Sequence, residues 1–183
     1  YRKFPSFSPN KILLGSMQSV IGTVPSSYRW ITNILGFTGG SVNGGLSMLG
    51  AYVRDTSPEG GLFHEEALFY YAYLKFYIAH QPDEVMQLIR DSHLDLVNNA
   101  LYAFMAINLS LNNHETSFGL QVIQQMKRGP QYLHMPVLDY EMGTLKLYHL
   151  ELGDAIHYLE VFTSNFKGKF YLKDAYFKLA WAY

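Results

Sequence analysis

The 183-residue chain contains no cysteine. This absence excludes disulfide bonds, zinc sites built from thiolates and thiol catalysis, although it does not fix a cellular compartment. Fourteen lysines and arginines against 15 aspartates and glutamates give a formal net charge of −1. Such a balance provides neither the basic field that favours nucleic acid nor an acidic tail, so nucleic acid is not expected as a partner.

Long apolar runs are also missing. The longest one, residues 100–111, is interrupted by Asn108 and Ser110. It is shorter than the 18 or more apolar residues that indicate a transmembrane helix, so no membrane span is expected in this segment. The chain starts at Tyr1 without a methionine and stops at Tyr183 within a helical pattern, which predicts an excerpt from a longer protein whose upstream signal, if any, lies outside it.

Helical periodicity is clearest in the last third of the chain. A helix is predicted over 136–150, with Pro136 at its first position. Residues 151–154 are predicted to form a turn, with Gly153 as a left-handed C-cap and Asp154 as the N-cap of a second helix. A third helix is expected from about Tyr171 to the end of the chain.

The pattern repeats at a spacing of about 36 residues. Gly143 steps back 36 positions to Ile107 and again to Tyr71, and it steps forward 37 positions to Ala180. On the second helix, the same step relates two sets of small or apolar residues: Ala155, Tyr158, Leu159 and Phe162, and Gly119, Val122, Ile123 and Met126. A period of this length predicts an all-α fold, a right-handed α-solenoid of antiparallel helix hairpins.

The last helix carries the residues Tyr176, Leu179, Ala180 and Tyr183 at the spacing of a tetratricopeptide first helix, and the repeat resembles that family. The resemblance implies tetratricopeptide-like repeats over 63–183, the last of them truncated, after an N-terminal lead-in and helical cap region over 1–62. The first copy departs from the pattern, because Asp83 stands where a small residue is expected.

The N-terminal segment has a second resemblance, carried by Val24-Pro25, Trp30, the stretch 34–39, Gly44-Gly45-Leu46 and Leu49. It is similar to the lead-in of tetratricopeptide proteins of the mitochondrial outer-membrane and inclusion-clearance type, and to bacterial relatives, especially from Bacteroidetes. The resemblance implies a non-enzymatic interaction protein with a longer parent chain. Its location stays open between the bacterial cytoplasm and, with an upstream signal, the periplasm or envelope.

Four further helices are expected in the first half of the chain. Their ranges are 11–21, 28–35, 46–54 and 63–80, and Ser26 or Ser27 is expected to cap the second of them. The glycine-rich loop between the second and third helices has neither the lysine of a phosphate-binding loop nor the final glycine of a nucleophile elbow.

Catalytic and metal sites are not predicted. His64 lacks a second histidine four residues on, because that position is Leu68, and no third ligand accompanies His149 and His157. The paired carboxylates 65/66 and 83/84 fall in first turns of helices, where negative charge complements the helix dipole. We therefore expect that the chain is not an enzyme and that it binds neither a metal nor a cofactor.

The tetratricopeptide resemblance implies that first helices line a concave surface. It places six residues there, as anchors for an apolar peptide or helix of a partner protein: Phe104, Asn108, Tyr140, Thr144, Phe177 and Trp181. The family's clamp for a terminal carboxylate is absent.

Two alternatives to this groove stay open. Aromatic stripes at helical spacing are often core, and the unpaired last helix predicts a homodimer caused by truncation. The alternative function is a glycan or small-molecule binding module of a bacterial envelope system, with Trp30, Tyr70 or Tyr73 stacking on sugars.

Overall fold

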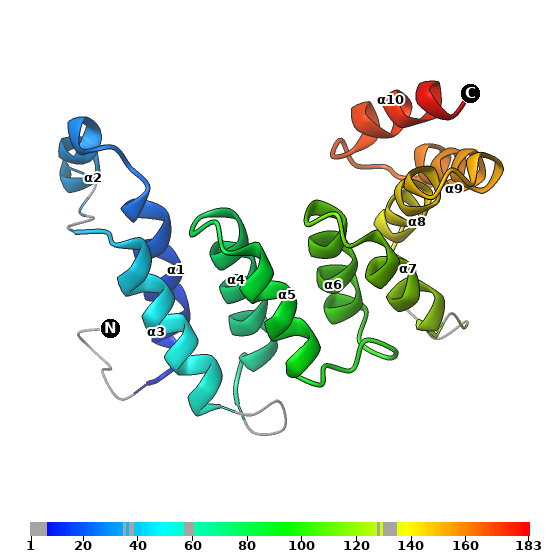
Figure 1. Cartoon of the computed structure of the whole chain (residues 1–183). Coiled ribbons are helices and arrows are strands. Elements are labelled where there is room, and N and C mark those ends of the chain that lie inside the picture. The colour runs from blue at the N-terminus through cyan, green and yellow to red at the C-terminus, as the bar shows by residue number, and fades with distance from the viewer. Residues whose placement is uncertain (1–6, 35, 37–38, 57–60, 128, 130–134) are drawn as a thin grey trace. The chain divides into compact units, whose positions relative to one another are not determined.

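The computed structural model describes residues 7–34, 36, 39–56, 61–127, 129 and 135–183. All the secondary structure in these residues is helical, which confirms the predicted all-α class (Figure 1). The elements are α1 (Asn10–Gly22), a 3-10 turn η1 (Ser26–Tyr28), α2 (Arg29–Ile34), α3 (Val42–Asp55), α4 (His64–Tyr77), α5 (Pro82–Asp91), α6 (Ala100–Asn112), α7 (Thr116–Gln125), α8 (Val137–Tyr148), α9 (Leu152–Asn165) and α10 (Leu172–Ala182).

The chain divides into two compact units, which we call the N-terminal unit (Tyr1–Val85) and the C-terminal unit (Met86–Tyr183). This division falls within α5. The boundary predicted between residues 62 and 63 concerns a change in sequence pattern and stays a prediction.

In the N-terminal unit, α1 and α3 lie side by side (Figure 1). Their backbones meet closely at two glycines: a Cβ built on Gly45 would lie 2.3 Å from the carbonyl oxygen of Gly15. Only glycine fits such an approach. Helix α4 packs on α3, and the core between these helices contains Ile12, Leu49, Tyr52 and Ala67.

In the C-terminal unit, α6 packs on α7, α8 on α9, and α10 on α9. Gly143 of α8 permits the close approach of α9, because an added Cβ would lie 2.6 Å from Cγ of Leu159. The core that unites α8, α9 and α10 is formed by Tyr140, Leu159, Phe162, Ala175 and Leu179.

Helices recur along the chain at nearly constant intervals. Helices α4, α6, α8 and α10 begin at residues 64, 100, 137 and 172, which are 36, 37 and 35 positions apart. Each of the first three is followed by a left-handed residue, His80, His114 or Leu150, with φ of 54°, 60° and 60°. The next helix then begins two residues further on, at 82, 116 or 152. The fold is thus repeat-like at the level of its helices and turns.

Both caps predicted in the turn at 151–154 are wrong. The left-handed residue after α8 is Leu150, not Gly153, and α9 already begins at Leu152, so Gly153 and Asp154 lie in its first turn. No side chain caps the η1 turn that begins at Ser26. The predicted helix 28–35 is observed as η1 followed by α2, and its last residue lies outside the described residues.

Candidate interaction surface

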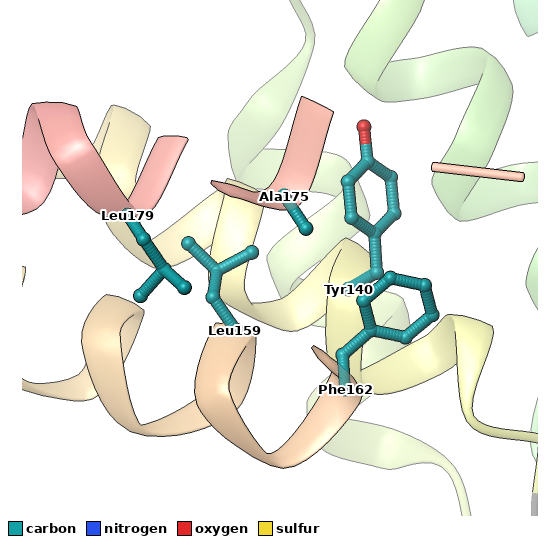
Figure 2. Packing of buried hydrophobic residues seen from close by; sticks show 5 residues of the cluster. All are labelled: Tyr140, Leu159, Phe162, Ala175 and Leu179. Atoms are coloured by element: carbon teal, nitrogen blue, oxygen red, sulfur yellow. The ribbon is translucent and has the colours of Figure 1, made fainter. Parts of the chain in front are cut away.

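The C-terminal helix α10 has one buried and one exposed face. Its buried residues are spaced i, i+3, i+4 and i+7, the pattern of a helix that packs along one side: Ala175, Lys178, Leu179 and Ala182. Figure 2 shows how Ala175 and Leu179 meet Leu159 and Phe162 of α9 and the ring of Tyr140 of α8. This core fixes which side of α10 faces outward.

Polar contacts at the edge of this core tie α10 to α8. The hydroxyl of Tyr140 donates to Oδ2 of Asp174 at 2.5 Å. Nζ of Lys178 forms an ion pair with the same carboxylate and lies 3.3 Å from the Tyr140 hydroxyl. It also lies 5.3 Å from the centre of the Tyr140 ring, within range of a cation–π interaction. One buried phenol, one carboxylate and one ammonium thus join two helices.

The pKa shifts of these groups maintain the protonation states that the contacts require. Burial, followed by the hydrogen bond to Asp174, raises the pKa of the Tyr140 phenol, so it remains a donor. Burial would raise the pKa of the Asp174 carboxyl, but the hydrogen bonds from Lys178 and Tyr140 outweigh it and hold that pKa below its usual value. Asp174 is therefore the acceptor for both neighbours near neutral pH.

Tyr171 fixes the start of α10. Its backbone is left-handed, with φ of 61°, and its ring stacks on Tyr140 with centroids 4.7 Å apart. A left-handed conformation is unfavourable for a bulky side chain. The stacking and the helix that follows hold Tyr171 in it.

Glu141 is buried beside this cluster with a side chain that is 1% exposed. Nδ2 of Asn108 on α6 donates to its Oε1 at 2.8 Å. Burial raises the pKa of Glu141 to about 7, although the hydrogen bond from Asn108 and the charge of Lys178 both lower it. The Glu141 carboxyl therefore keeps its proton to a higher pH than an ordinary glutamate does.

The outward face of α10 is aromatic. Tyr176, Phe177 and Trp181 are 58%, 65% and 69% exposed. Phe177 and Trp181 are one helical turn apart, and their ring centroids are separated by 6.1 Å. Exposed Ala180 stands beside them. We call these four residues the α10 aromatic face.

The six residues predicted to line a groove do not share one surface. Asn108, Tyr140 and Thr144 are buried, and Phe104 is partly buried. Thr144 donates to the backbone oxygen of Tyr140 within α8. Phe177 and Trp181 are exposed on α10. The structure brings Tyr140 together with α10 through core packing, and the partner-binding role of the six residues stays a prediction.

Sequence reasoning gave no site role to four residues of this region: Glu141, Tyr171, Asp174 and Lys178. A signal for two of them was present in the repeat. Residues about one repeat apart on first helices are neighbours, as Asn108 and Glu141 are at 33 positions and Tyr140 and Asp174 at 34. These separations are two or three positions shorter than the 36-residue period, so the repeat indicated which helices meet but not which residues.

Within the described residues, no three histidine, aspartate or glutamate side chains are grouped so that they could hold a metal ion. No helix in the described part of the chain has the length and apolar character needed to cross a membrane. The polar groups around Tyr140 are bonded to one another and join α8 to α10. Their arrangement indicates a structural role, which is to hold α10 against α8.

Comparisons with models of protein families, with curated proteins and with solved structures gave no match to this chain.

Proposed function

We propose that this chain is a non-enzymatic interaction module of the tetratricopeptide-like α-solenoid class that binds an amphipathic helix of a partner protein. The observation that carries the proposal is the α10 aromatic face. Two of the residues predicted from the sequence, Phe177 and Trp181, belong to it. The binding surface in this proposal is the outer side of α10, because Tyr140 and Asn108 are buried.

The helix intervals support the solenoid. Starts at 64, 100, 137 and 172 give a period of 35 to 37 residues, and a left-handed turn residue follows the first three of these helices. In the C-terminal unit, α6 packs on α7 and α8 on α9. At this interval α10 takes the position of a first helix in the repeat. Solenoid repeats contact their neighbours on both sides, so a first helix has a second face suited to another helix.

The shape of the α10 aromatic face favours a helical partner. Tyr176 and Ala180 form one i, i+4 row, and Phe177 and Trp181 form the next. Such rows are the ridges that fit the grooves of a second helix. Small Ala180 leaves space between the larger side chains, so a partner helix can approach closely there. The four residues are uncharged, and exposed Lys173 lies one turn before Phe177 at the edge of the face.

The size of the face also favours a macromolecular partner. A fully buried aromatic side chain covers 150–250 Å², so three rings exposed to about two thirds present on the order of 400 Å². Apolar patches of this size on a monomer are often functional. Tryptophan and tyrosine are also enriched among residues whose removal weakens protein interfaces most.

Selection from a display library of amphipathic helical peptides tests the proposal. The full chain serves as bait, and the selected peptides are then titrated against the wild type and against Phe177→Ala/Trp181→Ala. We expect the double variant to bind at least about tenfold more weakly, because removal of one central anchor costs 2 kcal/mol or more. The α10 face is exposed, so helicity measured by circular dichroism should be unchanged.

A matched control is Tyr28→Ala/Trp30→Ala, which removes two similarly exposed aromatic side chains from the N-terminal unit. It should bind the peptides like the wild type. Peptides that bind both double variants equally well, or a library from which no peptide is enriched, would contradict the proposal. A wild-type dimer in analytical ultracentrifugation that the Phe177/Trp181 variant abolishes would make a second copy the occupant. Binding of oligosaccharides that survives this variant would favour the glycan alternative.

A further inference from the structure

A hollow of about 520 Å³ lies in the N-terminal unit, where the start of α1 meets the start of α4. Its walls are largely apolar. Three aromatic side chains contribute to it, Phe7, Phe63 and Tyr70, and each is about half exposed, so part of each ring is accessible from outside. The volume is within the range of 300–1,000 Å³ that is usual for small-molecule sites.

Glu66 is the one charged side chain among the described residues that line this hollow. It lies in the first turn of α4 and forms no ion pair within the described part of the chain. A neutral ligand that covered this carboxylate would remove it from water without compensation, and an anion would be repelled. A cation compensates the lost hydration of the carboxylate.

Phe63 is held at the wall of the hollow by an unusual backbone. Its φ of 61° and ψ of 25° are left-handed, a conformation that is an outlier for a bulky residue. Hydrogen bonds hold the chain on both sides of it. The Tyr52 hydroxyl donates to the backbone oxygen of Leu62, and Nδ1 of His64 lies 2.8 Å from Oγ1 of Thr56. These bonds hold the backbone on which Phe63 reaches the wall of the hollow.

We propose that this hollow binds a quaternary ammonium group of the choline type. The three aromatic rings and the Glu66 carboxylate that line the hollow would attract such a cation through cation–π interactions and charge. Its methyl groups match the apolar walls and require no hydrogen-bond acceptors. A primary ammonium has three donors to satisfy, which a mostly apolar lining does not do. A ligand that also carries a carboxylate, such as glycine betaine, would be repelled by Glu66.

Titration of the full chain with choline tests this site. The comparison ligand is 3,3-dimethyl-1-butanol, which has the same shape without the charge. Calorimetry gives the affinities, and proton NMR gives the shift of the N-methyl signal. We expect choline to bind at least about tenfold more tightly than the alcohol. Its methyl signal should move upfield, because aromatic faces shield protons that lie over them.

Two matched pairs of variants locate the site. Glu66→Gln should abolish the preference for choline over the alcohol, whereas Glu65→Gln changes the net charge equally but lies outside the hollow. Tyr70→Leu should remove most of the upfield shift, whereas Tyr77→Leu, with a similarly exposed ring on the same helix, should not. All four positions are exposed, so circular dichroism should confirm an intact fold.

Equal affinities for choline and the alcohol would overturn the proposal. So would equal weakening by Glu65→Gln and Glu66→Gln, or no binding of choline to the wild type. Glycine betaine that binds as tightly as choline would contradict the role of Glu66.

Discussion

Asn108 on α6 and Glu141 on α8 are 33 residues apart in the chain, yet the amide Nδ2 of the first lies 2.8 Å from Oε1 of the second. The pair is buried, and it places a carboxyl group inside the C-terminal unit. Removal of a carboxylate from water is unfavourable unless the charge is compensated. One amide hydrogen bond and the nearby charge of Lys178 compensate it only in part, so the pKa of Glu141 stays raised, at about 7.

The first prediction concerns the pH dependence of stability. Between pH 4.5 and 7, the folded chain keeps a proton on Glu141 that the unfolded chain has released. The free energy of unfolding should therefore fall as pH rises through this window, by about 3 kcal/mol from this group. Glu141→Gln has no charge to bury and should remove this loss. Urea denaturation at pH 5 and pH 8 measures both proteins.

Glu160→Gln, at an exposed position of α9, is the control and should keep the wild-type pH dependence. Asp174 affects the stability of the chain in a different pH range. Its pKa is lowered, so the stability that it contributes is present above its usual value of 3.8 and is lost only as pH falls below that value. A wild type as stable at pH 8 as at pH 5 would contradict the assignment to Glu141.

The second prediction concerns the phenol of Tyr140. Tyr140→Phe keeps the ring in the core but removes the hydroxyl that donates to Asp174. A hydrogen bond to a charged group contributes about 1.5–3 kcal/mol, and we expect a loss of stability in this range. Amide hydrogen exchange should accelerate most in α10, because this bond joins α10 to α8. The exposed Tyr148→Phe on the same helix should change stability by less than about 0.5 kcal/mol. Equal effects of the two variants would argue against the bond.

The third prediction compares two glycines. Gly143→Ala places a Cβ 2.6 Å from Cγ of Leu159 and 3.1 Å from its backbone nitrogen, so α8 and α9 must move apart. Overpacking of this kind costs about 1–3 kcal/mol. A Cβ at Gly153, in the first turn of α9, meets no atom within 4 Å, and Gly153→Ala should stabilise by about 0.4–1 kcal/mol. Thermal denaturation of both variants measures these opposite signs, and two losses of similar size would refute the comparison.

The fourth prediction concerns the N-cap of α6. The side-chain oxygen of Asn99 accepts hydrogen bonds from the backbone nitrogens of Leu101 at 3.0 Å and Tyr102 at 3.2 Å. Asn99→Ala should therefore destabilise the chain by about 1 kcal/mol. Asn99→Ser keeps a capping oxygen and should restore most of this loss in chemical denaturation. If serine and alanine proved equally unfavourable, capping would not be the reason for the loss.

Much of the fold could be predicted from the sequence, because helix periodicity and repeat spacing depend on residues that are near one another. The predicted helices over 11–21 and 46–54 correspond to α1 and α3, and the one over 136–150 corresponds to α8. The turn before α9 could not be placed correctly from residue preferences. They favour Gly153 as the left-handed residue, whereas the chain uses Leu150 there and leaves Gly153 helical.

The candidate interaction surface could be predicted from the sequence only in part. Spacing along a helix shows which residues share a side, but not which neighbouring helix covers that side. Tyr140 and Phe177 were therefore assigned to one groove, although α9 and α10 bury the first and leave the second exposed. The contact between Tyr140 and Asp174 depends on how α10 lies against α8, which no local pattern encodes.

The exposed indole of Trp181 has an optical consequence. The chain has two tryptophans, Trp30 in the N-terminal unit and Trp181 in the C-terminal unit, and both are largely open to water. Each unit thus contains its own intrinsic fluorophore at the surface, sensitive to quenchers in solution. A helix that covers α10 would shield Trp181 from iodide and shift its emission to the blue, while Trp30 would go on reporting an uncovered surface in the same molecule.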